Sequence, residues 1–375
     1  MQEDTVVKGL EGVVAAETAL CDLDGAGGRL AYRGYSIEEL ARQATYEEVA
    51  YLLWQGELPT RAQRDGFIAE MVLARPLPEP LLSAFRLLPK TVDPMRSLQL
   101  SAAMLGAFDA DAADNSHEAN VRKALRLVSQ LATAICAHHR IRLGKEPVPP
   151  SKDLGHAANF LFMLTGERPS AVNVRAFDAS LILYSEHELN ASTFTTRVVS
   201  STLSDMHSAV AAGIGAIKGP LHGGAGEAVM LTLKEIGKVE NVDTFVDSAL
   251  AQKRRLMGFG HRVYRAGDPR AAVLRSLAEE ACRQSGQGMW FEMAVKLHER
   301  VNRAKGLIPN VDFYSAPLFY SLGIPVDLFT PVIVAGRIAG WTAHLLEQYQ
   351  DNRLIRPRGH YTGPGRRPFV PLDAR

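Results

Sequence analysis

The sequence has little of what marks secreted, metal-binding or membrane-spanning proteins. Only 3 of its 375 residues are cysteine, and Cys21, Cys136 and Cys282 are too widely spaced for a disulfide framework or a metal knuckle. The chain starts with early acidic residues and contains no apolar run of about 20 residues, which argues against a signal peptide and a membrane span. We therefore expect a soluble, cytoplasmic protein in a reducing compartment, with no membrane partner.

An excess of charge of one sign is also absent. The 42 Lys and Arg residues almost balance the 41 Asp and Glu residues, so the formal net charge is +1. A surface dedicated to nucleic acid or anionic lipid needs a basic excess, so neither partner is expected. A chain of this length can bury about three quarters of its unfolded surface, which is enough for a large core.

Apolar residues recur every three or four positions in nearly every long segment, which predicts an all-α protein. From Ser192 to Ile217 they form one stripe, which predicts a single helix. The segment GGRLAYRGY favours a short hairpin, and the absence of a fixed period disfavours a solenoid. The Pro- and Gly-rich end, from Pro357, predicts an extended arm that needs a surface, such as a partner subunit. Further helices are predicted at 37–54, 120–141, 171–184, 225–236, 271–281, 291–301 and 332–346.

Two loops place a histidine in an unusual setting. SEHELNAST holds His187 just ahead of the cap residues of the next helix. It is not a metalloprotease HExxH motif, because Ala191 stands where the second histidine would be. KGPLHGGAGEAVM holds His222 among glycines at the start of a helix, where the positive potential favours a neutral imidazole that can donate a hydrogen bond. A purely structural role for His222 is the alternative.

Charged side chains occur in three further segments. MGFGHRVYRAGDPRA, residues 257–271, sets His261 and Arg270 in a cationic loop suited to carboxylate or phosphate, with a solvated surface loop as the alternative. In PNVDFYSAPLF, Asp312 has apolar neighbours that would raise its pKa and favour a general base, with a helix cap as the alternative. Arg337 is the single charge in PVIVAGRIAGW, and a buried arginine needs an anion. With Arg356, these residues describe a site for a small dicarboxylate and proton transfer next to a carbonyl.

These motifs, in this order, resemble those of the citrate synthase family over nearly the whole chain. The matching segments are GLEGVV, LAYRGY, HELNASTFTTR, GPLHGGAGEAV, GFGHRVYRAGDPRA, PNVDFYSAPLF and DNRLIRPRGHYTG. The resemblance implies an all-α fold with a large helical domain, residues 1–222 and 327–375, and a small helical domain, residues 223–326. It also implies an active site in the cleft between the domains, and a homodimer with shared active sites.

The resemblance implies an acyltransferase that condenses acetyl-CoA with oxaloacetate in a Claisen-type reaction and hydrolyses citryl-CoA to citrate and CoA. Asp312 would take a methyl proton, His222 would hydrogen-bond the thioester oxygen, and His261 would donate a proton to the oxaloacetate carbonyl. No metal or cofactor is implied, because acetyl-CoA is a co-substrate. Arg356 would come from the other subunit. Oxaloacetate would be held by His187, Arg270, Arg337 and Arg356, and CoA by Arg255, Leu256, Met257, Gly258, Phe259 and Arg265.

Three other functions share features with this sequence. A 2-methylcitrate synthase using propionyl-CoA shares the motifs, and one methylene is worth only about 1–3 kcal/mol in a pocket. Gly226 stands where the family usually has Asn, and Ala316 where Gly is expected, so both bear on rate or acyl choice.

A catalytically silent helical binding or regulatory protein need not keep all three catalytic residues. A metal-dependent hydrolase would need His138 and His139, which point to different helix faces. Because no extra N-terminal domain is apparent, control by NADH is not expected.

Overall fold

The computed structural model describes residues 6–375 as an all-α protein, which confirms the predicted fold class. Its one small sheet is antiparallel, in the order β1-β2-β3, and lies where the hairpin was predicted. The strands are β1 (Cys21–Asp24), β2 (Arg29–Tyr32) and β3 (Tyr35–Ser36). The first ten helices are α1 (Ile37–Gln43), α2 (Tyr46–Gln55), α3 (Arg61–Ala74), α4 (Glu79–Leu87), α5 (Pro94–Ala107), α6 (His117–Arg142), α7 (His156–Thr165), α8 (Ala171–Ser185), α9 (Ala191–Ser200) and α10 (Met206–Ile217).

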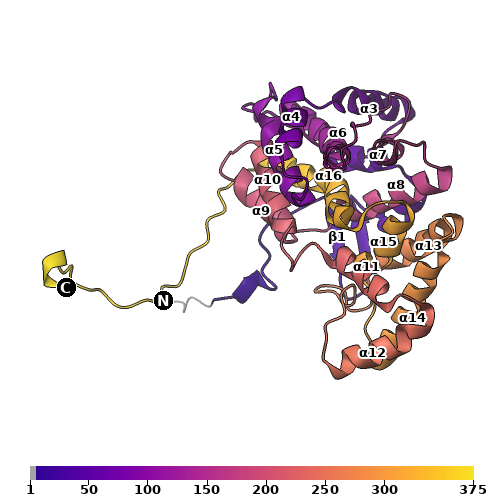
Figure 1. The fold of residues 1–375 in the computed structure, drawn as a ribbon. Helices are drawn as coiled ribbons and strands as arrows, with labels where there is room; N and C mark the ends of the chain where they lie inside the picture. The colour runs from indigo at the N-terminus through magenta and orange to yellow at the C-terminus, as the bar shows by residue number, and fades with distance from the viewer. Residues whose placement is uncertain (1–5) are drawn as a thin grey trace.

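The next five helices follow one another along the chain at one end of the molecule, at the lower right of Figure 1. Among them α13 packs mainly on α15 and α14, while α12 packs on α14. They meet the rest of the molecule where α13 contacts α1 and α8, and where α11 contacts α16. The domain boundaries given above stay a prediction. The bounds are α11 (Ala225–Ile236), α12 (Val242–Ala251), α13 (Pro269–Gln284), α14 (Gly288–Lys305), α15 (Val311–Ser321) and finally α16 (Phe329–Gln350).

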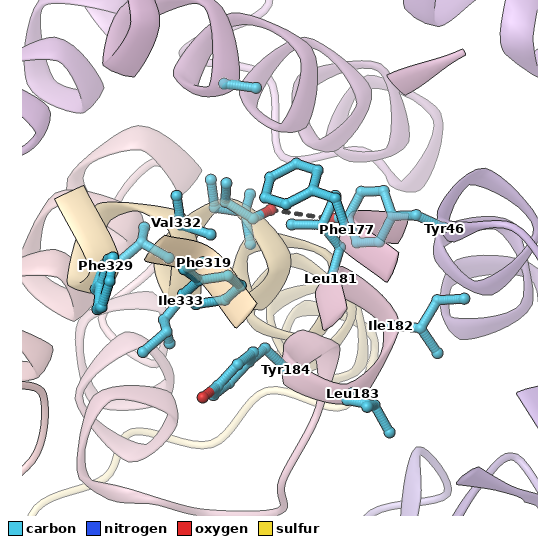
Figure 2. Close-up of a cluster of buried hydrophobic side chains, with 14 of the residues drawn as sticks. Tyr46, Phe177, Leu181, Ile182, Leu183, Tyr184, Phe319, Phe329, Val332 and Ile333 are labelled. Atoms are coloured by element: carbon cyan, nitrogen blue, oxygen red, sulfur yellow. Dashed lines mark hydrogen bonds between the residues drawn. The ribbon is translucent and has the colours of Figure 1, made fainter. Parts of the chain in front are cut away.

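Helix α16 runs through the core of the molecule and is buried on all sides over most of its length. A helix with apolar residues around its whole circumference is stable only inside a protein, which explains its position. Two glycines bring α8 against it: a Cβ at Gly336 would lie 2.8 Å from the Leu181 carbonyl oxygen, and one at Gly340 would lie 2.1 Å from that of Ser185. Figure 2 shows the apolar cluster between these helices, with Tyr184 at its edge. The close packing places the end of α8 beside Arg337.

The single helix predicted from Ser192 to Ile217 is wrong, because two helices, α9 and α10, occupy this segment. Leu203 has a positive φ of 65°, which interrupts the helical backbone. Asp205 then caps α10 by accepting a hydrogen bond from the Ser208 backbone N–H at 2.8 Å. The apolar spacing continues in phase across the break, so periodicity alone did not detect the turn. The segment 37–54 is divided in the same way, and Thr45 forms a capping box at the start of α2.

The C-terminal segment after α16 runs away from the helical body as an extended arm, as predicted (Figure 1). It ends in a short 3₁₀ turn, Leu372–Ala374. Large apolar side chains on the arm are exposed, with Phe369 at 84 % and Tyr361 at 75 %. Within the described part of the chain, no helix is both long enough and apolar enough to cross a membrane.

Candidate active site

The chemically important side chains lie at helix ends that converge around α16. The end of α8 and the turn after it supply Tyr184 and His187, and the turn before α11 supplies His222. The loop before α13 carries His261, and α15 begins one residue before Asp312. Backbone N–H and C=O groups at helix ends have no partner within the helix and can bind side chains or ligands, whereas those in the helix interior are already paired. This arrangement gathers groups from distant parts of the sequence around a common centre.

His222 is a neutral imidazole held by the first turn of α9. Its Nε2 lies 2.7 Å from the Ser192 hydroxyl, and the Ser192 backbone N–H donates to the same nitrogen at 3.3 Å. Burial and, next, the charge of Arg337 lower the pKa of His222 to about 4. A neutral ring that accepts at Nε2 carries its proton on Nδ1, so Nδ1 is the donor available to a ligand. His222 lies two residues before Gly224, the N-cap of α11, and is therefore outside the helix whose start was expected to keep it neutral. The causes of the lowered pKa are burial and the charge of Arg337.

His261 is held in the opposite tautomer. The backbone N–H groups of Val263 and Tyr264 donate to its Nδ1 at 3.0 and 3.2 Å, so the proton of the neutral ring is on Nε2. Burial and the charge of Arg270 lower the pKa of His261. The His187 ring meets the His261 ring edge to face, with centroids 5.2 Å apart. The Tyr264 hydroxyl lies 3.2 Å from Nε2 of His187, whose pKa burial and then Arg270 hold well below its usual value.

Arg270 is buried and paired with Asp268. Its Nε and Nη2 donate to the two oxygens of that carboxylate at 2.9 and 2.8 Å. Burial opposes both charges, but the pair keeps the pKa of Arg270 above, and that of Asp268 below, their usual values. Asp268 also accepts from the Val311 backbone N–H at 2.9 Å. It therefore links the arginine at the start of α13 to the helix start that carries Asp312.

Asp312 lies in the first turn of α15 and is only partly buried. The cap of this helix is Asn310, whose side chain accepts from the Asp312 backbone N–H at 3.1 Å, so the carboxylate of Asp312 is not used as the cap. Burial raises the pKa of Asp312, opposed first by a hydrogen bond from Tyr184 and then by the charge of Arg270. The Tyr184 hydroxyl donates to Oδ1 at 2.9 Å. A carboxylate with a raised pKa is suited to take a proton near neutral pH.

Arg337 is a buried cation that lacks an anionic partner among residues 6–375. It is 5 % exposed, its Nε donates to the Tyr184 carbonyl oxygen at 2.6 Å, and it forms no ion pair within 4.0 Å there. Burial lowers its pKa, partly offset by Glu186. The charge of Arg337 contributes to lowering the pKa of His222 and opposes the rise in the pKa of Asp312. A buried guanidinium is stable only with compensation, so this position is suited to an anionic ligand.

The loop at residues 255–260, where CoA is expected, is attached to the start of α15. Asn310 donates from its backbone N–H to the Gly258 carbonyl oxygen at 2.9 Å, and from its side chain to that of Gly260 at 3.0 Å. Gly258 has a φ of 83°, and a Cβ there would lie 2.5 Å from Val229. The Phe259 ring packs on Phe313 with centroids 4.6 Å apart. Arg255 and Arg265 are exposed, while Leu256 and Met257 are partly buried.

Arg356 lies outside this group in the single chain. It is exposed at the start of the C-terminal arm, where the Ile355 backbone N–H donates to the Ser201 hydroxyl at the end of α9. The expectation that Arg356 acts on another subunit therefore stays a prediction. At Gly226, a Cβ would lie 3.8 Å from the Ser315 hydroxyl and from Phe329, so a side chain there would face α15.

Sequence reasoning missed Tyr184, Ser192, Tyr264 and Asp268 as site residues. In the sequence, Tyr184 belongs to an apolar helix stripe and Ser192 to the cap residues of the next helix. Asp268 stands in an Asp-Pro turn, although its position two residues before Arg270 is a signal for a buried pair. For Tyr184 and Ser192, the partners are 128 and 30 residues away, and no local pattern reveals such contacts.

Fold and site together define an all-helical enzyme with a site for acid–base chemistry on an anionic substrate. The family model of the citrate synthase C-terminal domain matches residues 9–358. Citrate synthase 2 of Bacillus subtilis is 45 % identical over 372 residues, covering 99 % of this chain and 100 % of the relative. 2-Methylcitrate synthase 1 of Corynebacterium glutamicum is 42 % identical over 383 residues, covering 100 % of both.

A similar solved structure is that of citrate synthase from Thermoplasma acidophilum in a ternary complex with carboxymethyl coenzyme A and oxaloacetate. Its TM-score is 0.92 at 32 % identity, with 99 % of this chain and 100 % of that chain covered. The chain belongs to the citrate synthase family and is an acyltransferase. The predicted family and enzyme class are confirmed.

Proposed function

We propose that the enzyme condenses acetyl-CoA with oxaloacetate to form citrate and free CoA. The observation that supports this most directly is the combination of one carboxylate with a raised pKa and two neutral imidazoles of opposite tautomer. Asp312 can accept a proton, while His222 and His261 can each donate one hydrogen bond from a defined nitrogen. This set is what the formation of an enol and its attack on a ketone require.

In the first step, Asp312 takes a proton from the methyl group of acetyl-CoA. The electron pair of the broken C–H bond forms the enol carbon–carbon double bond, and charge develops on the thioester oxygen. His222 donates from Nδ1 to this oxygen. Because its pKa is lowered to about 4, the ring is neutral at pH 7, and its bond to Ser192 keeps the donor oriented.

In the second step, the enol carbon attacks the ketone carbon of oxaloacetate and forms the new carbon–carbon bond. The ketone oxygen becomes a hydroxyl by taking the proton from Nε2 of His261, the nitrogen left free by the two backbone N–H groups at Nδ1. The proton held by Asp312 returns through solvent to Nε2 of His261, which restores both groups. Water then attacks the thioester of citryl-CoA, one of its protons goes to the departing CoA sulfur, and the other is released as the new carboxylate forms. His187, Arg270 and Arg337 would hold the oxaloacetate oxygens.

The remaining parts of the proposal concern the assembly. We infer a homodimer in which Arg356 of one subunit completes the oxaloacetate site of the other. The exposed apolar side chains of the C-terminal arm support this, because such side chains gain stability by packing on another surface. Arg255 to Phe259 and Arg265 would hold CoA, with no metal or cofactor, and the enzyme would act in the cytoplasm.

The test is oxaloacetate-dependent release of free thiol, measured side by side with acetyl-CoA and propionyl-CoA. We expect the higher kcat/KM with acetyl-CoA, and chromatography should identify citrate as the product. A preference for propionyl-CoA would instead assign 2-methylcitrate synthesis, for which the Corynebacterium relative is the precedent. No thiol release with either substrate would contradict the proposed function.

A further inference from the structure

We propose that Tyr184 is a positioning residue that selects the reacting oxygen of Asp312 and adapts to both protonation states of this base. Its hydroxyl lies 2.9 Å from Oδ1 of Asp312 and 2.9 Å from the Ser315 hydroxyl oxygen. The Ser315 hydroxyl in turn donates to the Asp312 carbonyl oxygen at 3.0 Å. The inference rests on the proposed function, in which Asp312 is the general base.

The single phenolic proton determines which oxygen reacts. Burial and the neighbouring carboxylate hold the pKa of Tyr184 well above its usual value, so Tyr184 is always a donor at neutral pH. While Asp312 is ionised, the charge-assisted bond to Oδ1 is the stronger of the two choices. Among residues 6–375 no donor engages Oδ2 of Asp312. Oδ2 is therefore the oxygen that takes the substrate proton.

The same geometry accommodates the protonated base. Once Asp312 carries a proton, the attraction that directs the phenol toward Oδ1 is lost. The phenol can then donate to the Ser315 hydroxyl oxygen, which lies at the same distance from it as Oδ1. The Ser315 hydroxyl donates its own hydrogen bond to the Asp312 carbonyl oxygen. Tyr184 thus has an acceptor in either state, and no buried hydroxyl proton is left unpaired during the reaction.

Tyr184 also connects the base to the oxaloacetate-binding residues. Its carbonyl oxygen accepts from Nε of Arg337 at 2.6 Å, while its ring is 3 % exposed and packs on Phe319 with centroids 6.3 Å apart. A rotation of the end of α8 would therefore displace the base and the arginine together. This packing fixes the hydroxyl, so Tyr184 needs no contact with substrate to influence the reaction.

Two substitutions should shift the pKa of Asp312 in opposite directions. Tyr184→Phe keeps the ring but removes the donor that favours the carboxylate, so the acid limb of the kcat–pH profile should move to higher pH, by about one unit. Ser315→Ala removes the acceptor used when Asp312 is protonated, so the acid limb should move to lower pH. In both variants kcat should fall, while KM for oxaloacetate should stay within about threefold.

Tyr46→Phe is the matched control, because its hydroxyl is equally buried but donates to the Ala335 carbonyl oxygen at 2.9 Å. It should lower the melting temperature without moving the acid limb. An unshifted acid limb in Tyr184→Phe, or shifts of the same sign in both active-site variants, would overturn the proposal.

A second readout does not depend on turnover. The infrared carboxyl band that disappears in Asp312→Asn is titrated in the wild type and in Tyr184→Phe, and its midpoint should rise in the latter. An unchanged midpoint would overturn the proposal even if the enzyme proved inactive. Absence of thiol release by the wild type would instead count against the proposed function, so the two failures are distinguishable.

Discussion

Replacing Arg337 with methionine tests whether the buried cation is reserved for substrate. Arg337 is 5 % exposed, and within residues 6–375 its guanidinium donates a single hydrogen bond, to the Tyr184 carbonyl oxygen. Methionine keeps most of the side-chain volume and removes the charge. We expect Arg337→Met to fold and to lose most of its affinity for oxaloacetate.

The expected loss of oxaloacetate affinity in Arg337→Met follows from the substrate carboxylate that would be left unpaired. Removing one partner of a desolvated charge pair costs about 2–5 kcal/mol. At about 1.4 kcal/mol per factor of ten, the lower half of this range corresponds to a Kd roughly 30- to 300-fold weaker. The free protein should lose much less stability, because the loss of one hydrogen bond is opposed by the removal of a buried unpaired charge.

Calorimetric titration with oxaloacetate measures Kd directly, and thermal unfolding adds a second measure. At a ligand concentration of about 100 Kd, binding should stabilise the wild type by about 2.7 kcal/mol, whereas the variant at the same concentration should show little change. Arg142→Met is the control, because Arg142 pairs with Asp327 at 2.9 Å outside the site. It should lose stability and keep its Kd. A Kd for Arg337→Met within threefold of wild type would refute the reasoning.

Three further predictions follow from the site and the core. Asp312→Asn should lower kcat by about 10²- to 10⁴-fold with an unchanged circular dichroism spectrum, and near-normal turnover would remove Asp312 from the mechanism. Arg356→Ala should weaken oxaloacetate binding, and mixed dimers with Asp312→Asn should regain activity; no recovery would count against a shared site. Burial lowers the pKa of His156 to about 3, so the unfolded state binds more protons below pH 6.5. The free energy of unfolding should fall as the pH drops from about 6.5 to 3, by up to about 1.4 kcal/mol per pH unit. His156→Gln should flatten this dependence in urea titrations, and parallel curves would contradict it.

The helical fold could be predicted because its signal is local. A stripe of apolar residues every three or four positions determines a helix and the face it buries. In α11 this face consists of Val229, Met230, Leu233 and Ile236. The break between α9 and α10 could not be found that way, because Leu203 continues the spacing while being 60 % exposed. The signal there was the cap residue Asp205 followed by Ser208, which specifies a helix start regardless of the apolar pattern.

The site was predictable only where a side chain is chemically unusual in its own segment. His222 among glycines and Arg337 in an apolar helix are visible in the sequence. Tyr184 looks like any other core aromatic, and Figure 2 shows it beside Phe319 in the apolar cluster. Its contact with Asp312 joins residues 128 positions apart, and only the packing of α8 against α15 and α16 brings them together.

The charges of the site give a physical reason for oxaloacetate to bind before the acyl-CoA reacts. Asp268 compensates Arg270 in the free protein, and the three histidines are neutral. Arg337 has no ion-pair partner within the described residues 6–375, and Glu186 offsets the effect of its burial only in part. A dicarboxylate supplies the missing negative charge, so its binding is favoured most at the buried arginine. The acetyl thioester is uncharged and cannot replace it. We therefore expect oxaloacetate to be required for tight binding of the acetyl group, and Arg337→Met to weaken this coupling along with the affinity for oxaloacetate itself.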